Sequence, residues 1–146
     1  MARRRNIKAA RHPAMTINRQ ALGRRKLVYL AVSNKSRKYP EARSRVVYIG
    51  TTAGGIKRIA QSAADKAELL LGDYGVKHLD FYVVSCSPLR RVKTWLKLER
   101  GLLVAFKREY GDTPIANRRG GKAGWGDVLT YFSERRLVGV LRGFEQ

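Results

Sequence analysis

The sequence has little cysteine, few acidic residues and no long apolar run. Cys86 is the only cysteine, which excludes an internal disulfide and a zinc site built on paired cysteines, and is typical of a reducing cytoplasm. No run of 18 apolar residues occurs, so no transmembrane helix is expected. The basic N-terminus lacks the apolar stretch of a secretory signal. We therefore expect a cytoplasmic protein, with an organellar matrix as the alternative, since the first 26 residues are rich in arginine and free of acid.

The second imbalance is one of charge. The 146 residues include 31 Lys+Arg against 11 Asp+Glu, which gives a formal net charge of +20. A hydrophobic content of 44% is typical of a globular chain and excludes a fully disordered polycation. So much charge of one sign repels itself unless an anion neutralises it. The phosphate backbone of a nucleic acid is the natural partner, and no membrane partner is expected.

Basic residues are concentrated at the N-terminus. Residues 1–26 carry nine Lys/Arg and few large apolar residues, so this segment cannot bury enough surface to fold alone. We interpret residues 1–26 as a basic arm that binds phosphate, and a solubilising tail is the alternative. One folded domain is expected at 27–146. The arginines expected to contact nucleic acid are Arg3, Arg4, Arg5, Arg24 and Arg25.

The folded domain contains apolar segments of two kinds. Runs rich in β-branched and aromatic residues predict strands at 27–33, 45–52 and 79–86. Helical periodicity predicts helices at 55–71 and 91–110, with a short amphipathic segment near 127–138. Residues 34–45, with five basic residues, predict a polar loop between two antiparallel strands. The expected fold is α/β (α+β), a small, mostly antiparallel three-stranded sheet flanked by helices.

One acidic residue interrupts the second predicted helix. With about 100° per residue, Trp95, Leu98, Leu102 and Phe106 share one face, and Glu99 lies in the middle of it. A carboxylate among apolar side chains is costly unless it is paired or binds a metal. Three interpretations stay open: a buried ion pair, a helix offset so that the carboxylate reaches the edge of the face, or a metal-binding or acid–base carboxylate.

Five short elements follow one another along residues 27–117: Leu27-Val28-Tyr29, Tyr48-Ile49-Gly50, Arg58, Glu99 and, after Pro114, Asn117. Their identity and order resemble the motifs of the GIY-YIG nuclease superfamily. The sequence departs from the family at the first glycine, where Leu27 stands. It also lacks the histidine that often follows the family's arginine by about one turn.

This resemblance implies a metal-dependent endonuclease that hydrolyses phosphodiester bonds, with DNA favoured over RNA. Glu99 would hold one Mg²⁺ (or Mn²⁺), and Arg58 would bond the scissile phosphate. Tyr29 would act as general base on the attacking water, with Tyr48 close by, once the metal and Arg58 lower its pKa. Asn117 would orient a phosphate or cap the active-site loop.

Basic residues near these motifs are expected to contact the nucleic acid. The interval between the two tyrosine motifs is longer than the family's usual hairpin, and its excess is the basic segment 34–45, which we expect to contact DNA as an insertion. The residues expected to bind nucleic acid in the folded domain are Lys35, Arg37, Lys38, Lys57, Arg118, Arg119 and Lys122.

Two other classes of protein fit the same composition. The first is a non-catalytic nucleic-acid-binding protein of GIY-YIG-like fold, such as a ribonucleoprotein component. The second is a basic structural protein with a chance Tyr-Ile-Gly, which predicts that Glu99 is paired inside the core and far from Tyr29. A homodimer or a larger nucleoprotein assembly is left open.

Overall fold

A three-stranded antiparallel sheet forms the centre of the molecule. The structure, a computed structural model, describes residues 6–12, 26–73, 75–117 and 124–145. Its strands are β1 (Leu27–Lys38), β2 (Arg43–Thr52) and β3 (Leu79–Val84), in the order β2-β1-β3. Both outer strands run antiparallel to β1. The predicted three-stranded antiparallel sheet with flanking helices is confirmed.

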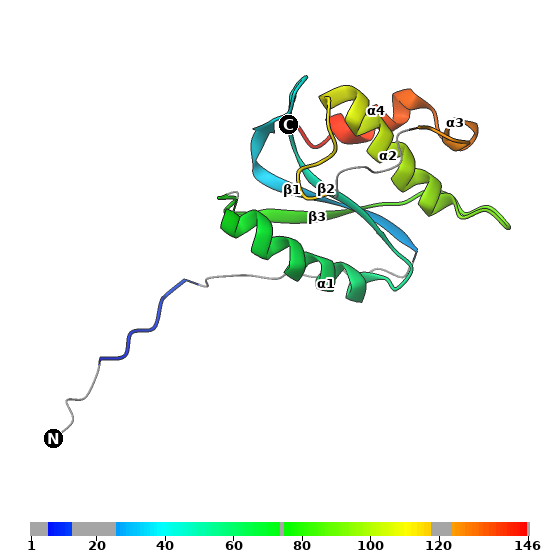
Figure 1. Cartoon of the computed structure of the whole chain (residues 1–146). Coiled ribbons are helices and arrows are strands. Elements are labelled where there is room, and N and C mark those ends of the chain that lie inside the picture. The colour runs from blue at the N-terminus through cyan, green and yellow to red at the C-terminus, as the bar shows by residue number, and fades with distance from the viewer. Residues whose placement is uncertain (1–5, 13–25, 74, 118–123, 146) are drawn as a thin grey trace.

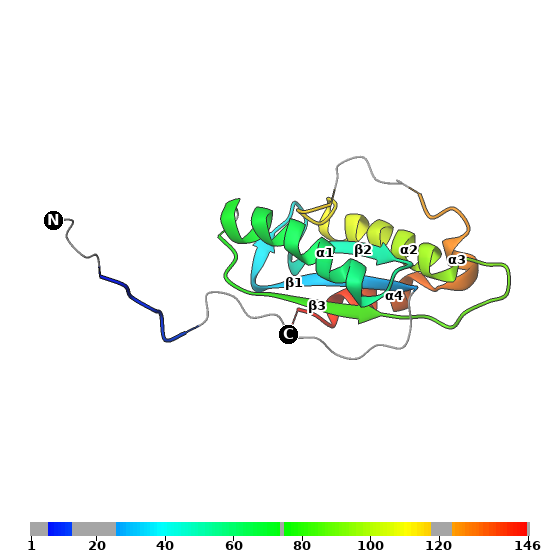
Figure 2. The same cartoon turned by 90° about the horizontal axis from the view of Figure 1, so that it is seen from below.

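Helices cover both faces of this sheet (Figure 1). One face carries α1 (Ile56–Ala67), which continues into a π-helical turn, η1 (Glu68–Asp73), and lies in front of the strands in Figure 2. The other face carries α2 (Thr94–Tyr110), α3 (Val128–Tyr131) and α4 (Glu134–Arg142). Since side chains alternate between the faces of a strand, a strand covered on both sides is apolar throughout, as residues 27–32 of β1 are.

The two faces of β1 enter different apolar clusters. Val28, Leu30 and Val32 pack with α2, α3 and α4 in the larger cluster. Leu27 and Tyr29 pack with Ile59 of α1 on the opposite face. The core therefore lies on both sides of the sheet, and α1 and α2 lie on opposite faces of it.

The predicted loop at 34–45 is wrong, because most of it belongs to the sheet. β1 continues to Lys38 and β2 begins at Arg43, which leaves only residues 39–42 as the connection. Tyr39 fixes this turn. Tyr39 is 6% exposed, and its hydroxyl donates to the Val46 carbonyl at 2.9 Å. Its ring packs edge-on against the Phe106 ring, with the two ring centroids 5.1 Å apart. Strand pairing is made by backbone groups, so charged side chains did not prevent it.

The helix boundaries differ by a few residues from the predicted ones. The helix predicted at 55–71 is regular only to Ala67 and then widens into η1, which passes Gly72. α2 begins at Thr94 rather than at 91, and it ends at Tyr110 as predicted, where Gly111 with a left-handed φ of 87° closes the helix. The amphipathic segment near 127–138 is divided between α3 and α4, with Ser133 accepting a hydrogen bond from the Arg136 amide at the start of α4.

Among the residues that the structure describes, no helix is both long enough and apolar enough to cross a membrane.

Candidate functional site

A pocket of about 470 Å³ opens beside the outer strand β2, between α1 and α2. All of these elements contribute side chains to it, together with the loop that follows α2. Its lining residues are Tyr29, Tyr48, Thr51, Arg58, Ser62, Asp65, Lys66, Leu103, Lys107, Thr113 and Asn117. Four of the five residues predicted to be catalytic therefore share one pocket: Tyr29, Tyr48, Arg58 and Asn117.

The two tyrosines are packed against a glycine on the floor of this region. Tyr29 lies opposite Gly50 in the sheet register, and the Tyr29 and Tyr48 ring centroids are 5.9 Å apart. A Cβ atom on Gly50 would lie 2.7 Å from Cε1 of Tyr48 and 2.9 Å from Cζ of Tyr29. Glycine is required at position 50 by the rings that cover it, not by a turn.

Gly50→Ala is therefore expected to destabilise the fold and displace both rings. Overpacking of this kind typically costs about 1–3 kcal/mol, measured as the free energy of unfolding in urea. Gly54→Ala is the matched control, because its added Cβ would meet no atom closer than 3.6 Å. Equal stability of the two variants would contradict this account of Gly50.

Tyr29 is a buried residue that lines the pocket, and burial dominates its ionisation. Tyr29 is 2% exposed, and its pKa is raised to about 12, chiefly by burial and to a smaller extent by neighbouring Tyr48. A hydrogen bond with Ser62 and the charge of Arg58 act in the opposite direction but do not offset burial. The prediction that Arg58 lowers the pKa of Tyr29 is correct for the direction of its effect, but the pKa as a whole is raised. Near neutral pH the Tyr29 phenol in this chain carries its proton.

Asn117 uses its side-chain amide to hold the loop after α2 against β2. Its Oδ1 accepts from the Ile49 amide at 3.0 Å and its Nδ2 donates to the Ile49 carbonyl at 2.8 Å. The Ala116 amide adds a bond to the Val47 carbonyl at 2.9 Å. Together these bonds occupy the outer edge of the sheet, as another strand would. Of the two predicted roles for Asn117, these contacts favour the loop cap over a phosphate contact.

Asn117→Asp should consequently lower stability by about 1–3 kcal/mol, because a carboxylate cannot donate to the Ile49 carbonyl and leaves it unpaired. Urea denaturation measures the change. Thr113→Ala, in the same loop and lining the same pocket, should stay within about 0.5 kcal/mol of the parent. A wild-type stability for Asn117→Asp would show that the loop is held by other contacts.

Arg58 stands on the exposed side of α1, as its position opposite the apolar stripe predicts. Its Nη1 lies 3.3 Å from the Gln61 Oε1, a weak contact that leaves most guanidinium donors available. Ser62, Asp65 and Lys66 follow at intervals of four, seven and eight residues, so they share this side of the helix. Asp65, Lys66 and Lys107 were missed by the sequence analysis, although the spacing from Arg58 was a signal for the first two.

The pocket carries more positive than negative charge. Arg58, Lys66 and Lys107 line it with a single carboxylate, Asp65. Lys66 is fixed, because its Nζ donates to the Ala116 carbonyl at 3.1 Å and lies 4.6 Å from the Tyr48 ring centroid. Such an arrangement favours an anionic ligand.

Glu99 is half-buried and lies at the edge of the buried face of α2, so the prediction that it lies in the middle is wrong. The buried face includes Gly101 and Ala105, which a pattern of large apolar residues ignores. A Cβ on Gly101 would lie 2.7 Å from Val128, so the missing side chain admits α3. The helix is turned toward α3 and α4, and Glu99 is moved outward.

The relation of Glu99 to the pocket is therefore indirect. Glu99 is not among the pocket-lining residues. Leu103, which does line the pocket, follows it on α2 by one helical turn, or about 6 Å along the helix axis. No ion pair or hydrogen bond joins the Glu99 side chain to another residue in the described part of the chain. The core ion pair expected of a basic structural protein is thus not found.

Metal-binding groups are sparse in the described ranges. They contain no group of three or more His, Cys, Asp or Glu side chains that could hold a metal ion. Mg²⁺ can nevertheless be held by one or two carboxylates, its remaining positions being filled by water and substrate phosphate. Glu99 fits such a role by its chemistry, and Asp65 is a second carboxylate of the same kind.

The residues predicted to bind nucleic acid fall into two groups. Lys35, Arg37 and Lys38 lie on β1 near the hairpin turn, and Lys57 is exposed on α1. The others lie outside the described residues: Arg3, Arg4, Arg5, Arg24, Arg25, Arg118, Arg119 and Lys122.

Comparison of the chain with protein-family models, with characterised proteins and with solved structures found no match in any of the three.

Proposed function

We propose that the chain is a nucleic-acid endonuclease that hydrolyses phosphodiester bonds at the pocket beside β2, with DNA favoured over RNA. The observation that carries the proposal is the convergence of Tyr29, Tyr48, Arg58 and Asn117 on one positively lined pocket. The same four residues belong to the sequence motifs that resemble the GIY-YIG superfamily. The net charge of +20 supports a polyanionic substrate.

Within this proposal the side chains have distinct roles. Arg58 bonds the scissile phosphate with its planar guanidinium, while Lys66 and Lys107 add positive charge. Tyr29 and Tyr48 contact the attacking water, with the Tyr29 phenol protonated unless a bound cation lowers its pKa. Asn117 holds the wall of the pocket. Glu99 would hold a divalent cation, whose chemistry is to stabilise negative charge on the reacting phosphate.

A second candidate is a nucleic-acid-binding protein that does not cleave. Two observations favour it: Glu99 does not line the pocket, and burial keeps the proton on Tyr29. Such a protein would bind phosphate through Arg58, Lys66 and Lys107 without hydrolysing it.

Nicking of supercoiled plasmid by the purified chain distinguishes the two candidates. An endonuclease converts supercoiled DNA to the open circle in Mg²⁺ or Mn²⁺ and stops when EDTA is added. If the chain retards plasmid DNA in a gel but leaves it supercoiled with either metal, and also binds structured RNA without cutting it, the binding protein is favoured.

A further inference from the structure

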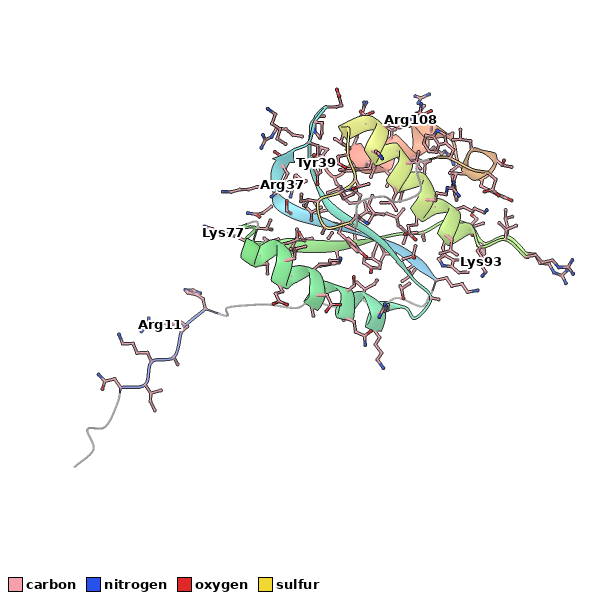
Figure 3. All side chains as sticks on the ribbon, in the orientation of Figure 1. Arg11, Arg37, Tyr39, Lys77, Lys93 and Arg108 are labelled. Atoms are coloured by element: carbon pink, nitrogen blue, oxygen red, sulfur yellow. The ribbon has the colours of Figure 1, made fainter. Side chains whose placement is uncertain are left out.

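A second pocket lies at the turn end of the β1–β2 hairpin, where Lys38 and Arg43 flank the turn. Its volume is about 380 Å³, and we call it the hairpin groove. In Figure 3 Arg37 and Lys77 lie at this end of the molecule, whereas Lys93 lies at the opposite end. The groove is lined by Lys35, Ser36, Arg37, Lys38, Arg43, Gly75 and Val76.

The groove gathers charges of one sign. Four of its seven lining residues are cations, and none is acidic. Lys38 and Arg43 are direct cross-strand partners, an arrangement that destabilises a sheet when both charges have the same sign. An anion bound between the strands would remove this repulsion.

Two carboxylates near the hairpin, those of Glu145 and Glu41, have contacts away from the groove lining. The Glu145 carboxylate accepts from the Ser44 hydroxyl at 2.5 Å and from the Arg45 amide at 3.1 Å. The Glu41 side chain lies against Gly111, where a Cβ would meet its Cγ at 2.9 Å. Neither residue lines the groove.

One of the four cations is held in place in advance. The Arg43 Nε donates to the Ser36 hydroxyl at 3.0 Å and its Nη2 donates to the Ser36 carbonyl at 2.9 Å. The guanidinium is thereby fixed across the hairpin, with its Nη1 donors not used in these bonds. A planar guanidinium fixed in this way is suited to phosphate oxygens, and it loses little freedom when it binds them.

The groove and the pocket can be reached by one nucleic acid. Val76 of the groove belongs to the same apolar cluster as Tyr48 and Ala116, on the α1 side of the sheet. Arg43 and Tyr48 are five residues apart on β2, or about 17 Å. Phosphates of one DNA strand advance about 3.4 Å per step along the helix axis, so this distance corresponds to about five steps.

We propose that the hairpin groove binds backbone phosphates of duplex DNA and acts as a second anchor for the molecule held at the pocket. This inference rests on the proposed nucleic-acid substrate. It does not depend on hydrolysis, because a phosphate anchor contributes affinity and no reacting group.

The test compares two double variants that each remove two exposed charges. Lys38→Gln with Arg43→Gln removes groove cations, and Arg90→Gln with Lys93→Gln removes an equal charge near the start of α2. Binding to a 20-base-pair duplex is measured in EDTA over a range of salt concentrations. The groove variant should bind about 10- to 60-fold more weakly at 0.1 M salt, with the slope of log K against log salt reduced by about 2. The control should change affinity by no more than about threefold.

Lys35→Gln with Lys38→Gln is the companion variant, because it leaves the Arg43–Ser36 bonds intact and should show the same loss of slope. Equal weakening by the groove variants and the control pair would overturn the groove while leaving the proposed substrate standing. Selective weakening by the groove variants in a chain that never nicks DNA would support the groove and overturn only the hydrolytic proposal. A wild-type chain that binds no duplex overturns both.

Discussion

Replacing Arg58 by lysine should reduce plasmid nicking about 30- to 1000-fold. A lysine keeps the positive charge but loses the planar pair of donors that meets two phosphate oxygens at once. Removal of one such electrostatic donor costs roughly 2 to 4 kcal/mol of transition-state stabilisation, which gives this factor. Arg58 is exposed, and its hydrogen bond to the Gln61 side chain is long, at 3.3 Å. The fold should therefore tolerate the change, and the loss should appear in single-turnover cleavage rather than in the unfolding midpoint.

Lys57→Ala is the matched control for this result. Lys57 is the neighbouring residue on α1, is exposed, and does not line the pocket. Its removal should leave single-turnover cleavage within about threefold, since an exposed charge away from the site is largely screened. If Lys57→Ala is crippling and Arg58→Lys is mild, the assignment of the arginine is shifted by one residue.

Much of the fold could be predicted because its strands and helices differ in apolar pattern. The run Leu27–Val32 has no polar interruption, which is typical of a strand covered on both faces. The charged half of the hairpin could not be found in this way, because its pairing depends on backbone hydrogen bonds and on Tyr39. A single buried aromatic residue in a basic segment is a weak signal, although it is what fixes the turn.

The candidate site was predictable as a set of motif residues, but its electrostatics were not. The pKa of Tyr29 depends on how closely α1 covers the sheet, which no local pattern reports. Lys107 enters the pocket from α2, and helical periodicity shows only that it faces away from the core. Glu99 was misplaced for a related reason, since Gly101 and Ala105 rotate α2 without contributing large apolar side chains.

Glu99→Ala should abolish nicking while DNA binding stays or tightens. As the proposed ligand of the divalent cation, Glu99 supports several kcal/mol of charge stabilisation, so its loss should slow cleavage at least about 100-fold. Binding should not suffer, because a negative charge near phosphate is removed. Stability should not suffer either, since Glu99 is half-buried and has no ion pair or hydrogen bond with the rest of the described chain. A change of more than about 0.5 kcal/mol in unfolding free energy is not expected.

Asp65→Asn is the variant that tests this assignment, because Asp65 is the one carboxylate that the described residues place in the pocket lining. Asparagine keeps the shape of the side chain and removes its charge, so cation binding is weakened with little change in packing. If Glu99 is the ligand, Asp65→Asn should cleave at least as fast as the wild type, because it removes no cation ligand and takes a negative charge out of a pocket that binds phosphate. Loss of nicking in Asp65→Asn, with Glu99→Ala active, would move the metal-binding role from α2 to α1. It would also show that the resemblance at Leu98-Glu99-Arg100 is accidental, because the metal-binding carboxylate would then lie on α1 with Arg58 and Lys66.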